Sequence, residues 1–432
     1  MKAAVIGLGK IGLPIAVTIA DAGIEVVGGD ASQRVVDDVN NGRAPFPGEP
    51  GLTEGIVRSL EKGLLSARTS NSEASTGADV IIVVVPMYVD ENGVPDYSIL
   101  ESASRDIGSV LVSGQTVIYE TTLPVGATRS RLAPVLEESS GLTAGKDFHV
   151  VHSPERVFSG RIFQDLKSYP KIVGGLTPVC GQIAVSFYEA VLEFDERSDL
   201  DQPNGVWDLG SVEAAEFTKL AETTYRDVNI ALANEFGDFA ERLGVDVYQI
   251  IDAANSQPFS HIHRPGIYVG GHCIPVYPRF YSSVDESALL PPLARDVNDA
   301  GPERAVSRLE THLGSLSGVT VGVLGSTYRG GVKEMAFSGV FPLVKSLEAQ
   351  GAVVAVHDPM LSDDELEGLG FRPHVLGDEI DAVIVQSDHQ EYASLDPDDL
   401  GNPKAVVDGR KILNPDHFVE SSTALLVIGI GE

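Results

Sequence analysis

The 432-residue sequence has two cysteines, one tryptophan and half as many basic as acidic side chains. Cys180 and Cys273 are too few for a disulfide framework, and neither has a second cysteine at the short spacing of a structural metal site. Long apolar runs are missing as well, because those at 80–86 and 424–430 have the length of a strand. We therefore expect no metal and no membrane partner.

The charge is strongly one-sided, with 31 basic against 62 acidic residues and a formal net charge of −31. Such a surface repels nucleic acid, so no nucleic-acid partner is expected. The acidic residues are spread along the chain, which suits a protein kept soluble in concentrated salt, where screening removes self-repulsion. We therefore hypothesise a salt-requiring source. A glycine-rich turn interrupts the first apolar run, so we expect no signal peptide and a cytoplasmic protein.

The sequence begins with the pattern of a dinucleotide-binding fold. Residues 2–6 indicate a buried strand, residues 7–12 a G-x-G-x-x-G turn and residues 13–20 a helix. A second strand pattern ends at Asp30, an acid that accepts hydrogen bonds from ribose hydroxyls and repels a 2′-phosphate, which favours NAD over NADP. The expected cofactor contacts are Gly7, Gly9, Lys10, Ile11, Gly12 and Asp30.

Polar turns follow the next strand patterns, at 80–85 and 115–119. The carboxyl ends of strands line the ligand crevice of a doubly wound sheet, so Pro86, Thr121 and Thr122 should face the cofactor. Simple turn chemistry is the alternative.

A further strand pattern at 150–152 leads into Glu155 and Arg156. A carboxylate and a guanidinium at the end of a strand suit a polar substrate or a catalytic water, and an exposed salt bridge is the alternative. Residues 171–175 are expected to close this half of the sheet. The following helix, at 179–189, contains Cys180, which we interpret as structural.

Residues 211–243 have few helix breakers and predict one long helix, followed by a second at 246–255. Polar residues of the long helix recur at three- and four-residue spacing and form one stripe: Lys219, Thr223, Arg226 and Asp227. Such a stripe is usually solvated, but small apolar neighbours favour burial between domains, where a substrate supplies polar partners.

Glycines and prolines surround Cys273 between Pro265 and Pro278. This composition predicts an irregular loop that brings backbone close to a ligand and presents a thiol. Packing of small residues is the alternative, because free cysteines are often buried.

The last third of the chain repeats the first pattern in a shorter form. Helices are expected at 298–313 and 341–349, and strands at 319–325, 353–359 and 381–386. Arg329 and Lys333 lie in a glycine-containing turn suited to phosphates. We predict an α/β protein with two Rossmann-like doubly wound domains joined by a central long-helix segment, divided at 1–205, 206–300 and 301–432.

Assembled, these residues resemble the nucleotide-sugar 6-dehydrogenases, the family of the UDP-glucose, GDP-mannose and UDP-N-acetylmannosamine dehydrogenases. The resemblance runs from end to end and is carried, in order, by 7–14, 120–126, 153–156, Lys219 with its helix, and 270–275. The Pro-Glu-Arg form and the segments 226–229 and 271–273 are more similar to the N-acetylhexosamine branch than to the UDP-glucose branch.

The resemblance implies NAD as cofactor, a UDP-sugar substrate, four-electron oxidation of a sugar C6 hydroxyl to a carboxylate, and a homodimer or larger homo-oligomer formed through the central helix. It implies that Cys273 attacks an aldehyde to give a thiohemiacetal and then a thioester, with Lys219 stabilising the oxyanion and Glu155 orienting water together with Thr122. The implied substrate contacts are Glu155, Arg156, Lys219, Asn229, Arg264, Gly270, Gly271, Arg329 and Lys333.

Three positions depart from the family pattern. Thr223 replaces an asparagine but keeps a catalytic hydroxyl donor, Tyr277 replaces a water-activating aspartate, and Ala336 replaces an arginine. Three alternatives therefore stay open. They are a UDP-glucose 6-dehydrogenase, a two-electron hydroxyacid dehydrogenase that does not need Cys273, and a nucleotide-sugar binder without turnover.

Overall fold

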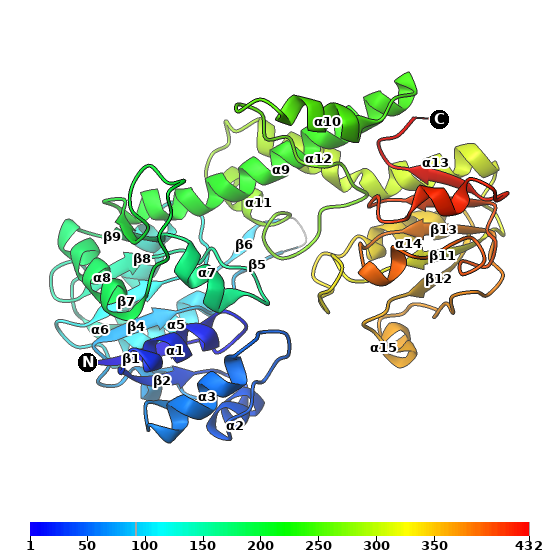
Figure 1. Ribbon diagram of the computed structural model, residues 1–432. Coiled ribbons are helices and arrows are strands. Elements are labelled where there is room, and N and C mark those ends of the chain that lie inside the picture. Colours follow the sequence, from blue (N-terminus) through cyan, green and yellow to red (C-terminus); the bar gives the residue numbers. More distant parts are fainter. Residues whose placement is uncertain (91–92, 432) are drawn as a thin grey trace. The chain divides into compact units, whose positions relative to one another are not determined.

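The computed structural model describes residues 1–90 and 93–431, and it divides into two compact units (Figure 1). Unit 1 comprises Met1–Glu222 with Ser283–Asp285, and unit 2 comprises Thr223–Ser282 with Glu286–Glu432. The long helix expected at 211–243 is present as α9 (Val212–Leu243), and the division falls inside it. The three-part division at 1–205, 206–300 and 301–432 stays a prediction.

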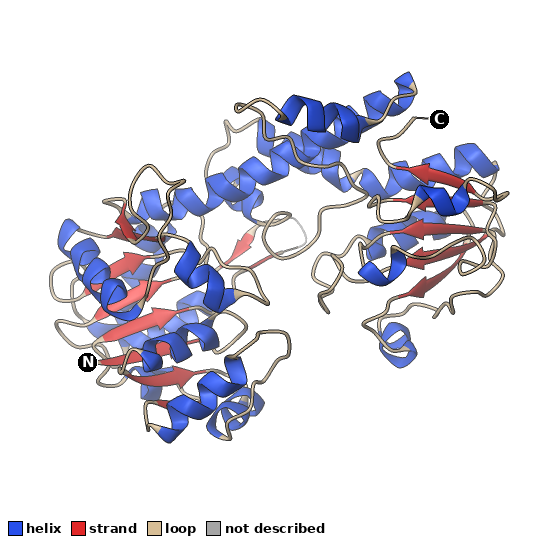
Figure 2. Ribbon diagram, in the orientation of Figure 1, coloured by secondary structure: helices blue, strands red, loops and turns tan. Residues whose placement is uncertain are grey.

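Unit 1 is built on an eight-stranded sheet with helices on both faces (Figure 2). Its strands are β1 (Lys2–Ile6), β2 (Glu25–Gly29), β3 (Leu65–Arg68), β4 (Val80–Val83), β5 (Tyr88–Val89), β6 (Pro95–Asp96), β7 (Thr116–Tyr119), β8 (His149–His152), β9 (Lys171–Gly175) and β10 (Val206–Asp208). Its helices are α1 (Gly12–Asp21), α2 (Gln33–Asn40), α3 (Leu52–Glu61), α4 (Asn71–Ser75), α5 (Ser98–Gly108), the π-helix η1 (Thr128–Leu132), α6 (Ala133–Ser140), α7 (Ile162–Ser168), α8 (Pro178–Val191) and the first part of α9. The strand order is β10-β9-β8-β7-β4-β1-β2-β3, while β5 and β6 form a separate hairpin.

Strand β1 shows why this sheet is covered on both faces. Ala3 and Val5 pack into one hydrophobic core, and Ala4 and Ile6 pack into a second. A strand buried on both faces is apolar along its length, which is how residues 3–6 of β1 read.

The far edge of this sheet differs from the prediction that residues 171–175 close it. Strand β10 pairs outside β9, and β9 itself runs antiparallel to β8. Strand β10 has only three residues, none of them fully buried, so its sequence has no apolar alternation from which a strand is recognised.

Unit 2 carries a second, five-stranded sheet in the order β12-β11-β13-β14-β15, with all pairs parallel. Its strands are β11 (Thr320–Leu324), β12 (Val353–His357), β13 (Ala382–Val385), β14 (Ala405–Asp408) and β15 (Ala424–Val427). Its helices are the rest of α9, α10 (Val247–Asn255), α11 (Tyr277–Ser282), α12 (Leu290–Asp299), α13 (Gly301–Leu313), α14 (Val340–Ala349), α15 (Asp363–Gly368), and the 3-10 turns η2 (Gln390–Tyr392) and η3 (Pro415–Phe418). The predicted fold class, with two Rossmann-like sheets and a central long helix, is confirmed.

The helix expected at 298–313 is instead split. Helix α12 ends at Asp299 and α13 begins at Gly301 with Pro302 in its first turn. Proline has no backbone N–H to continue a helix but is well placed at a helix start, so the chain ends one helix and begins another here.

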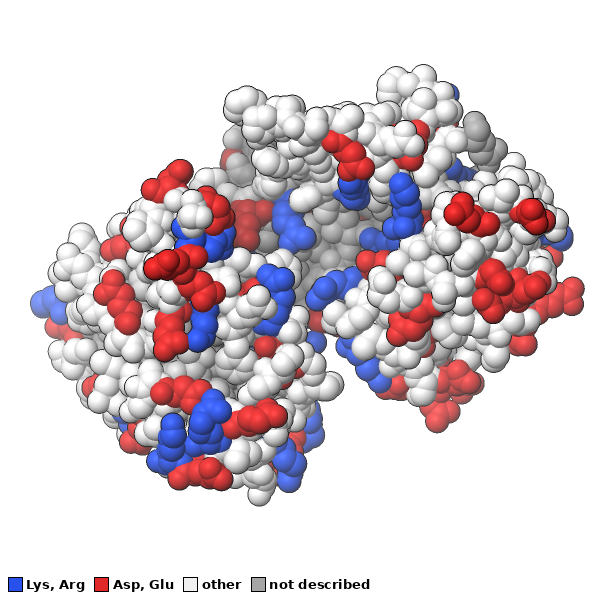
Figure 3. Space-filling model, in the orientation of Figure 1, with Lys and Arg blue, Asp and Glu red and all other residues white. Residues whose placement is uncertain are grey.

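The surface of each unit carries scattered acidic side chains on the face drawn in Figure 3. Their spread in space matches their spread along the sequence. Within residues 1–90 and 93–431, no helix has the length and apolar character needed to span a bilayer.

Candidate active site

The turn between β1 and α1 contains three glycines, and its backbone is accessible at the second of them, Gly9. Gly7 has a φ of +96°, and a Cβ there would lie 2.9 Å from the carbonyl carbon of Val84. A Cβ on Gly12 would lie 1.9 Å from the Gly7 oxygen, whereas no described atom comes within 4 Å of one on Gly9. Close packing therefore requires glycine at positions 7 and 12. The open space beside Gly9 lets a pyrophosphate approach the backbone there. Lys10 and the half-buried Ile11 lie on the same turn.

Asp30 is fixed directly behind this turn. Its Oδ2 accepts the backbone N–H of Leu8 at 2.9 Å, and its Oδ1 accepts that of Ser32 at 2.9 Å. The carboxylate therefore ties the end of β2 to the glycine turn. This position fits the predicted ribose contact.

The predicted cofactor residues after β4 and β7 lie on neighbouring strands, since Val83 pairs with Tyr119. Thr121 donates from Oγ1 to the Val85 carbonyl at 2.6 Å, which links the two turns. Thr122 is buried and Pro86 is exposed. The structure brings these residues to the carboxyl edge of the sheet, as the strand pattern predicted.

Glu155 lies in a buried charge cluster that the sequence pattern did not predict. Lys171 places its Nζ 2.7 Å from Glu155 Oε2 and 3.1 Å from Glu120 Oε1. The hydroxyl of Tyr188 on α8 donates to the same Glu120 oxygen. We call Glu120, Glu155, Lys171 and Tyr188 the Lys171 cluster. One signal was readable: a lysine opening an apolar, buried strand needs a buried partner.

Burial and ion pairing act against each other in this cluster. Burial raises the pKa of Glu120 to about 7, although Lys171 opposes the shift. Burial also opposes ionisation of Glu155, but Lys171 outweighs it and the pKa of Glu155 falls below its usual value. Burial disfavours the Lys171 ammonium, yet the two carboxylates raise its pKa. At neutral pH, Glu155 is ionised, Lys171 is protonated, and Glu120 is near its titration point.

The polar stripe on α9 is largely buried. Lys219 and Thr223 lie one helical turn apart with 8% and 3% of their surface exposed. Asp227, one turn further along, accepts from the Asn298 side chain at 2.8 Å and lies 3.3 Å from Arg295 Nε. Burial raises the pKa of Asp227 to about 6 despite Arg295.

Two predicted substrate residues have protein partners. Arg156 donates from Nε to Glu222 at 3.0 Å. Asn229 donates to the His261 carbonyl at 2.7 Å and accepts the His263 N–H at 2.9 Å. Asn229 therefore holds the segment that leads into the cysteine loop.

Arg264, the next predicted contact, is engaged in the same way. It donates to the Tyr248 carbonyl at 3.1 Å and pairs with Asp252 on α10. A substrate that binds Arg264 has to share it with these partners.

The glycines before Cys273 allow close backbone packing on the turn after β11. A Cβ on Gly270 would lie 2.6 Å from the Phe337 carbonyl oxygen and 2.8 Å from the Tyr328 side chain. Gly271 has a φ of +89° and donates its N–H to the Ala336 carbonyl at 2.9 Å. Neither position accepts a side chain without displacement.

Cys273 itself is exposed as a free thiol, whereas Cys180 is buried in the core of unit 1. His272, beside Cys273, places Nε2 2.7 Å from Glu334 Oε1. The irregular loop ends where α11 begins at Tyr277, whose N–H donates to the Cys273 carbonyl at 2.9 Å. The cysteine is therefore presented from a loop with several fixed points.

The turn after β11 contains the two predicted phosphate contacts. Arg329 donates from Nε to the Tyr328 hydroxyl at 3.0 Å. Lys333 lies 2.5 Å from Glu365 on α15, in an exposed ion pair. An exposed pair of this kind is weak, so Lys333 can exchange Glu365 for a phosphate at small cost.

This turn repeats the arrangement seen in unit 1. Gly325 has a φ of +93° and donates to the His357 carbonyl at 2.7 Å, as Gly7 donates to the Gly29 carbonyl at 2.7 Å. Asp358, after β12, accepts the Ser326 N–H at 2.7 Å, as Asp30 accepts that of Leu8. The weak internal repeat in the sequence thus corresponds to a repeated backbone arrangement.

Arg410, after β14, is a second residue that the sequence pattern missed. It donates from Nε to the Gln386 carbonyl at 2.7 Å and from Nη2 to the Tyr268 carbonyl at 3.1 Å. Burial lowers its pKa. It joins the cysteine loop to the carboxyl edge of the second sheet. An arginine three residues after the apolar run 405–407 was the available signal.

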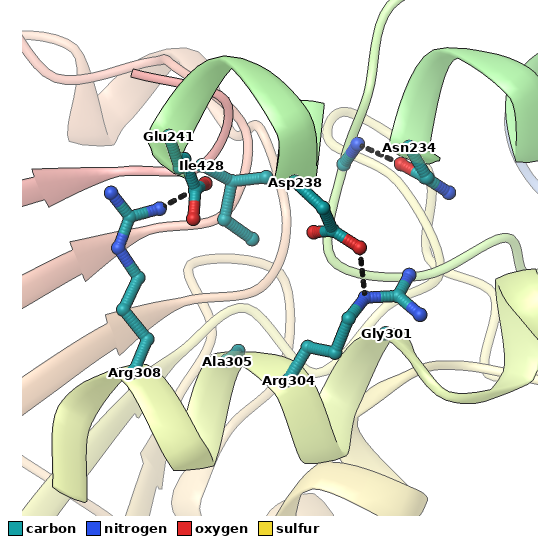
Figure 4. A pocket seen from close by; sticks show the side chains of 9 residues that line it. Asn234, Asp238, Glu241, Gly301, Arg304, Ala305, Arg308 and Ile428 are labelled. Atoms are coloured by element: carbon teal, nitrogen blue, oxygen red, sulfur yellow. Dashed lines mark hydrogen bonds and ion pairs between the residues drawn. The ribbon is translucent and has the colours of Figure 1, made fainter. Parts of the chain in front are cut away.

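A small pocket between α9 and α13 has a structural explanation. Figure 4 shows Asp238 paired with Arg304, at 3.5 Å, and Glu241 paired with Arg308. These charged groups satisfy one another and fasten α9 to α13 within unit 2.

The sheet of unit 1, its open glycine turn and its fixed acid define a dinucleotide-binding protein. The chain belongs to the UDP-glucose/GDP-mannose dehydrogenase family. The NAD binding domain of that family matches residues 1–192, its central domain 213–300 and its UDP binding domain 322–415. The protein is therefore an NAD-dependent oxidoreductase, and the resemblance noted in its sequence is confirmed.

Individual relatives match over nearly the whole chain. A UDP-N-acetyl-D-mannosamine dehydrogenase from Pyrococcus horikoshii is 35% identical, covering 100% of this chain and 99% of that protein. An NDP-N-acetyl-D-galactosaminuronic acid dehydrogenase from Ralstonia solanacearum is 33% identical, covering 94% and 95%. The solved UDP-D-ManNAc dehydrogenase structure from Pyrococcus horikoshii has a TM-score of 0.89 at 34% identity, with both chains fully covered.

Proposed function

We propose that the chain oxidises the C6 hydroxyl of a UDP-N-acetylhexosamine to the uronic acid in an NAD-dependent four-electron reaction, with UDP-N-acetyl-D-mannosamine as the favoured substrate. The observation that carries this proposal is the exposed thiol of Cys273 on a loop packed against the turn after β11. That turn belongs to the segment matching the UDP binding domain. Full-length similarity to UDP-N-acetyl-D-mannosamine dehydrogenases supports the substrate class.

The proposed chemistry is divided among a thiol, an ammonium and a carboxylate. Bound NAD supplies the two-electron acceptor for each oxidation. Cys273 adds to the intermediate aldehyde as thiolate, and the resulting thiohemiacetal is oxidised to a thioester. Lys219 stabilises the developing oxyanion, and its burial strengthens this charge interaction.

Hydrolysis of the thioester completes the reaction. Glu155 and Thr122 orient the water, and Glu155 is held ionised by Lys171. Thr223 contributes a hydroxyl one turn from Lys219. Tyr277 provides no carboxylate near the cysteine, so in this proposal the water depends on Glu155.

The remaining predicted contacts divide between cofactor and substrate. Gly7, Gly9, Lys10, Ile11, Gly12, Asp30, Pro86, Thr121 and Thr122 are proposed to hold NAD. Arg156, Asn229, Arg264, Gly270, Gly271, Arg329 and Lys333 are proposed to hold the UDP-sugar.

We also propose that α9 forms a homodimer or larger homo-oligomer. Its half in unit 2 exposes large apolar side chains that recur at three-, four- and seven-residue spacing: Tyr225, Leu232, Phe236, Phe239 and Leu243. Such a stripe is typical of a helix covered by a partner. Light scattering should give at least twice the chain mass, and Phe236→Lys with Phe239→Lys should reduce it to one chain. A wild-type monomer would contradict the proposal.

The acidic surface suggests that the enzyme works in concentrated salt, in the cytoplasm of a salt-requiring organism. Its melting temperature and activity should rise between low and molar potassium chloride, because screening removes self-repulsion. Full activity and an unchanged melting temperature at low salt would contradict this adaptation.

The substrate is tested by initial rates of NADH formation in high salt. The panel comprises UDP-N-acetylmannosamine, UDP-N-acetylglucosamine, UDP-glucose and UDP-galactose. We expect an N-acetylated sugar to be fastest. UDP-glucose far ahead would favour the UDP-glucose 6-dehydrogenase alternative, and tight binding of these sugars without NADH would favour a non-catalytic binder.

A further inference from the structure

Glu120 opens the segment 120–126 that carries the family resemblance, but the proposed function gives it no role, although it lies directly behind Glu155. Building on that proposed function, we propose that Glu120 is the final proton acceptor for thioester hydrolysis, reached from Glu155 through the Lys171 ammonium. Glu120 and Lys171 are then positioning residues, because they act on the water only through Glu155.

The three groups form a continuous path for a proton. Lys171 Nζ lies 2.7 Å from Glu155 Oε2 and 3.1 Å from Glu120 Oε1, both within hydrogen-bond reach. The exposed fractions of the side chains fall along the path, from 11% at Glu155 to 5% at Lys171 and 0% at Glu120. A proton can therefore enter at Glu155 and be held where bulk water does not reach it.

A purely structural ion pair accounts for this cluster poorly. Two buried carboxylates share the Lys171 ammonium, and a second buried negative charge is costly unless a proton neutralises it. Glu120 Oε2 is also fully buried with no hydrogen-bond partner in the described part of the chain. The cluster thus has capacity for one more proton, and Glu120 carries the oxygen that lacks a bond.

The surrounding charges agree with this assignment. Glu120, whose pKa burial raises to about 7, faces Lys171 from β9, Glu155 from the segment after β8, and Tyr188 from α8. His152 on β8 stays neutral, because burial lowers its pKa to about 3. Lys219 on α9 acts on Glu155, where it favours the ionised form.

The step balances in atoms and charge. Water bonds to the acyl carbon through its oxygen and gives one proton to Glu155, while the bond from that carbon to the Cys273 sulfur breaks. Lys171 gives one of its protons to Glu120 and then takes the proton from Glu155, so it is an ammonium again at the end of the step. The new carboxylic acid protonates the departing thiolate. One thioester and one water become one uronate, one thiol and one proton, which Glu120 holds until it is released.

The test is the pH dependence of hydrolysis in Glu120→Gln, which keeps the shape of the side chain but cannot take a proton. In the wild-type enzyme, hydrolysis should rise with pH through about 7, because the acceptor must be ionised. In the variant, a rapid burst of two NADH per Cys273 should precede hydrolysis slowed by about 10- to 100-fold. The rise near pH 7 should disappear.

Tyr119→Phe is the matched control. Tyr119 is the residue next to Glu120, and the substitution removes its buried hydroxyl. That hydroxyl lies 2.7 Å from Ser104 Oγ and outside the Lys171 cluster. Its pH profile should match that of the wild-type enzyme.

Tyr188→Phe is a second variant, which keeps the Glu120 carboxyl but removes a hydrogen bond to it. Its rise should move to higher pH, because a carboxylate that loses a donor is harder to ionise.

The outcomes separate the two proposals. A wild-type pH profile in Glu120→Gln, or rates lowered equally at every pH, would overturn the relay while leaving the proposed function intact. Absence of NADH from the wild-type enzyme with every UDP-sugar would overturn the proposed function and the relay with it. If Glu120→Gln does not fold, an unshifted profile in Tyr188→Phe overturns the relay.

Discussion

His272 Nε2 lies 2.7 Å from Glu334 Oε1, which joins the residue beside Cys273 to the turn after β11. Both residues belong to unit 2. The contact attaches the cysteine loop to the turn after β11. The loop carries the proposed nucleophile, and the turn is proposed to bind phosphate.

Glu334→Ala should therefore loosen the cysteine loop. We expect kcat to fall about 3- to 10-fold, which corresponds to about 1 kcal/mol for a partly exposed pair, with NAD affinity unchanged. Steady-state kinetics with titration of NAD would measure both. Glu367→Ala, an exposed acid on α15, is the control, and equal effects of the two changes would argue against a specific link.

Cys273→Ser should lower kcat by about 1000-fold or more, because serine is a far weaker nucleophile than a thiolate at neutral pH. NAD binding should remain, since the glycine turn and Asp30 lie in unit 1. Cys180→Ser, at the buried cysteine 3.1 Å from Thr177 Oγ1, should keep its activity. Near-normal rates in Cys273→Ser would remove the covalent mechanism.

Asp30→Ala should weaken NAD binding and relax the rejection of NADP. Part of the loss is structural, because the Leu8 N–H that donates to Asp30 at 2.9 Å is left without its acceptor, at about 1–3 kcal/mol. Asp30→Asn keeps one of the two acceptor oxygens and separates the effects in part: it should recover part of the stability but none of the discrimination. The ratio of NAD to NADP affinities measures this, and an unchanged ratio in both variants would place the ribose elsewhere.

Glu216 should make stability fall as pH rises, contrary to the usual effect of a carboxylate. Its carboxyl accepts the N–H groups of Gly126 at 2.5 Å and Thr128 at 2.8 Å, yet burial raises its pKa to about 7. Between the usual pKa of 4.5 and about 7, the folded chain holds a proton that the unfolded chain releases, so the free energy of unfolding decreases with pH. Glu120 and Asp227 act in the same direction.

Melting temperatures measured from pH 5 to 7.5 check this sign. Histidines whose pKa burial lowers act in the opposite direction below pH 6.5, so the test is the wild-type melting temperature minus that of Glu216→Gln, which does not titrate at this position. This difference should fall as the pH rises, and a difference that rises with pH would contradict the assigned direction.

The fold could be predicted because its signals are local. The apolar strand 2–6, the glycine turn and the acid at position 30 lie within one short stretch, and each has a distinct residue pattern. The exposed thiol likewise lies in a segment whose glycines and prolines indicate a loop.

The Lys171 cluster could not be predicted, because it depends on the direction of a strand. Strand β9 runs antiparallel to β8, with His152 opposite Gly174, so Lys171 lies beyond the carboxyl end of β8, beside Glu155. A parallel β9 would place its first residue at the opposite edge of the sheet. The sequence of β9 is apolar after its lysine and does not reveal its direction.

The most direct test of the account is the number of NADH molecules formed for each UDP-sugar consumed, measured in high salt with the fastest substrate of the panel. Two NADH per sugar, with a uronic acid as product, is the result that four-electron oxidation through Cys273 predicts. One NADH per sugar would contradict it, because the reaction would then stop after a single two-electron step.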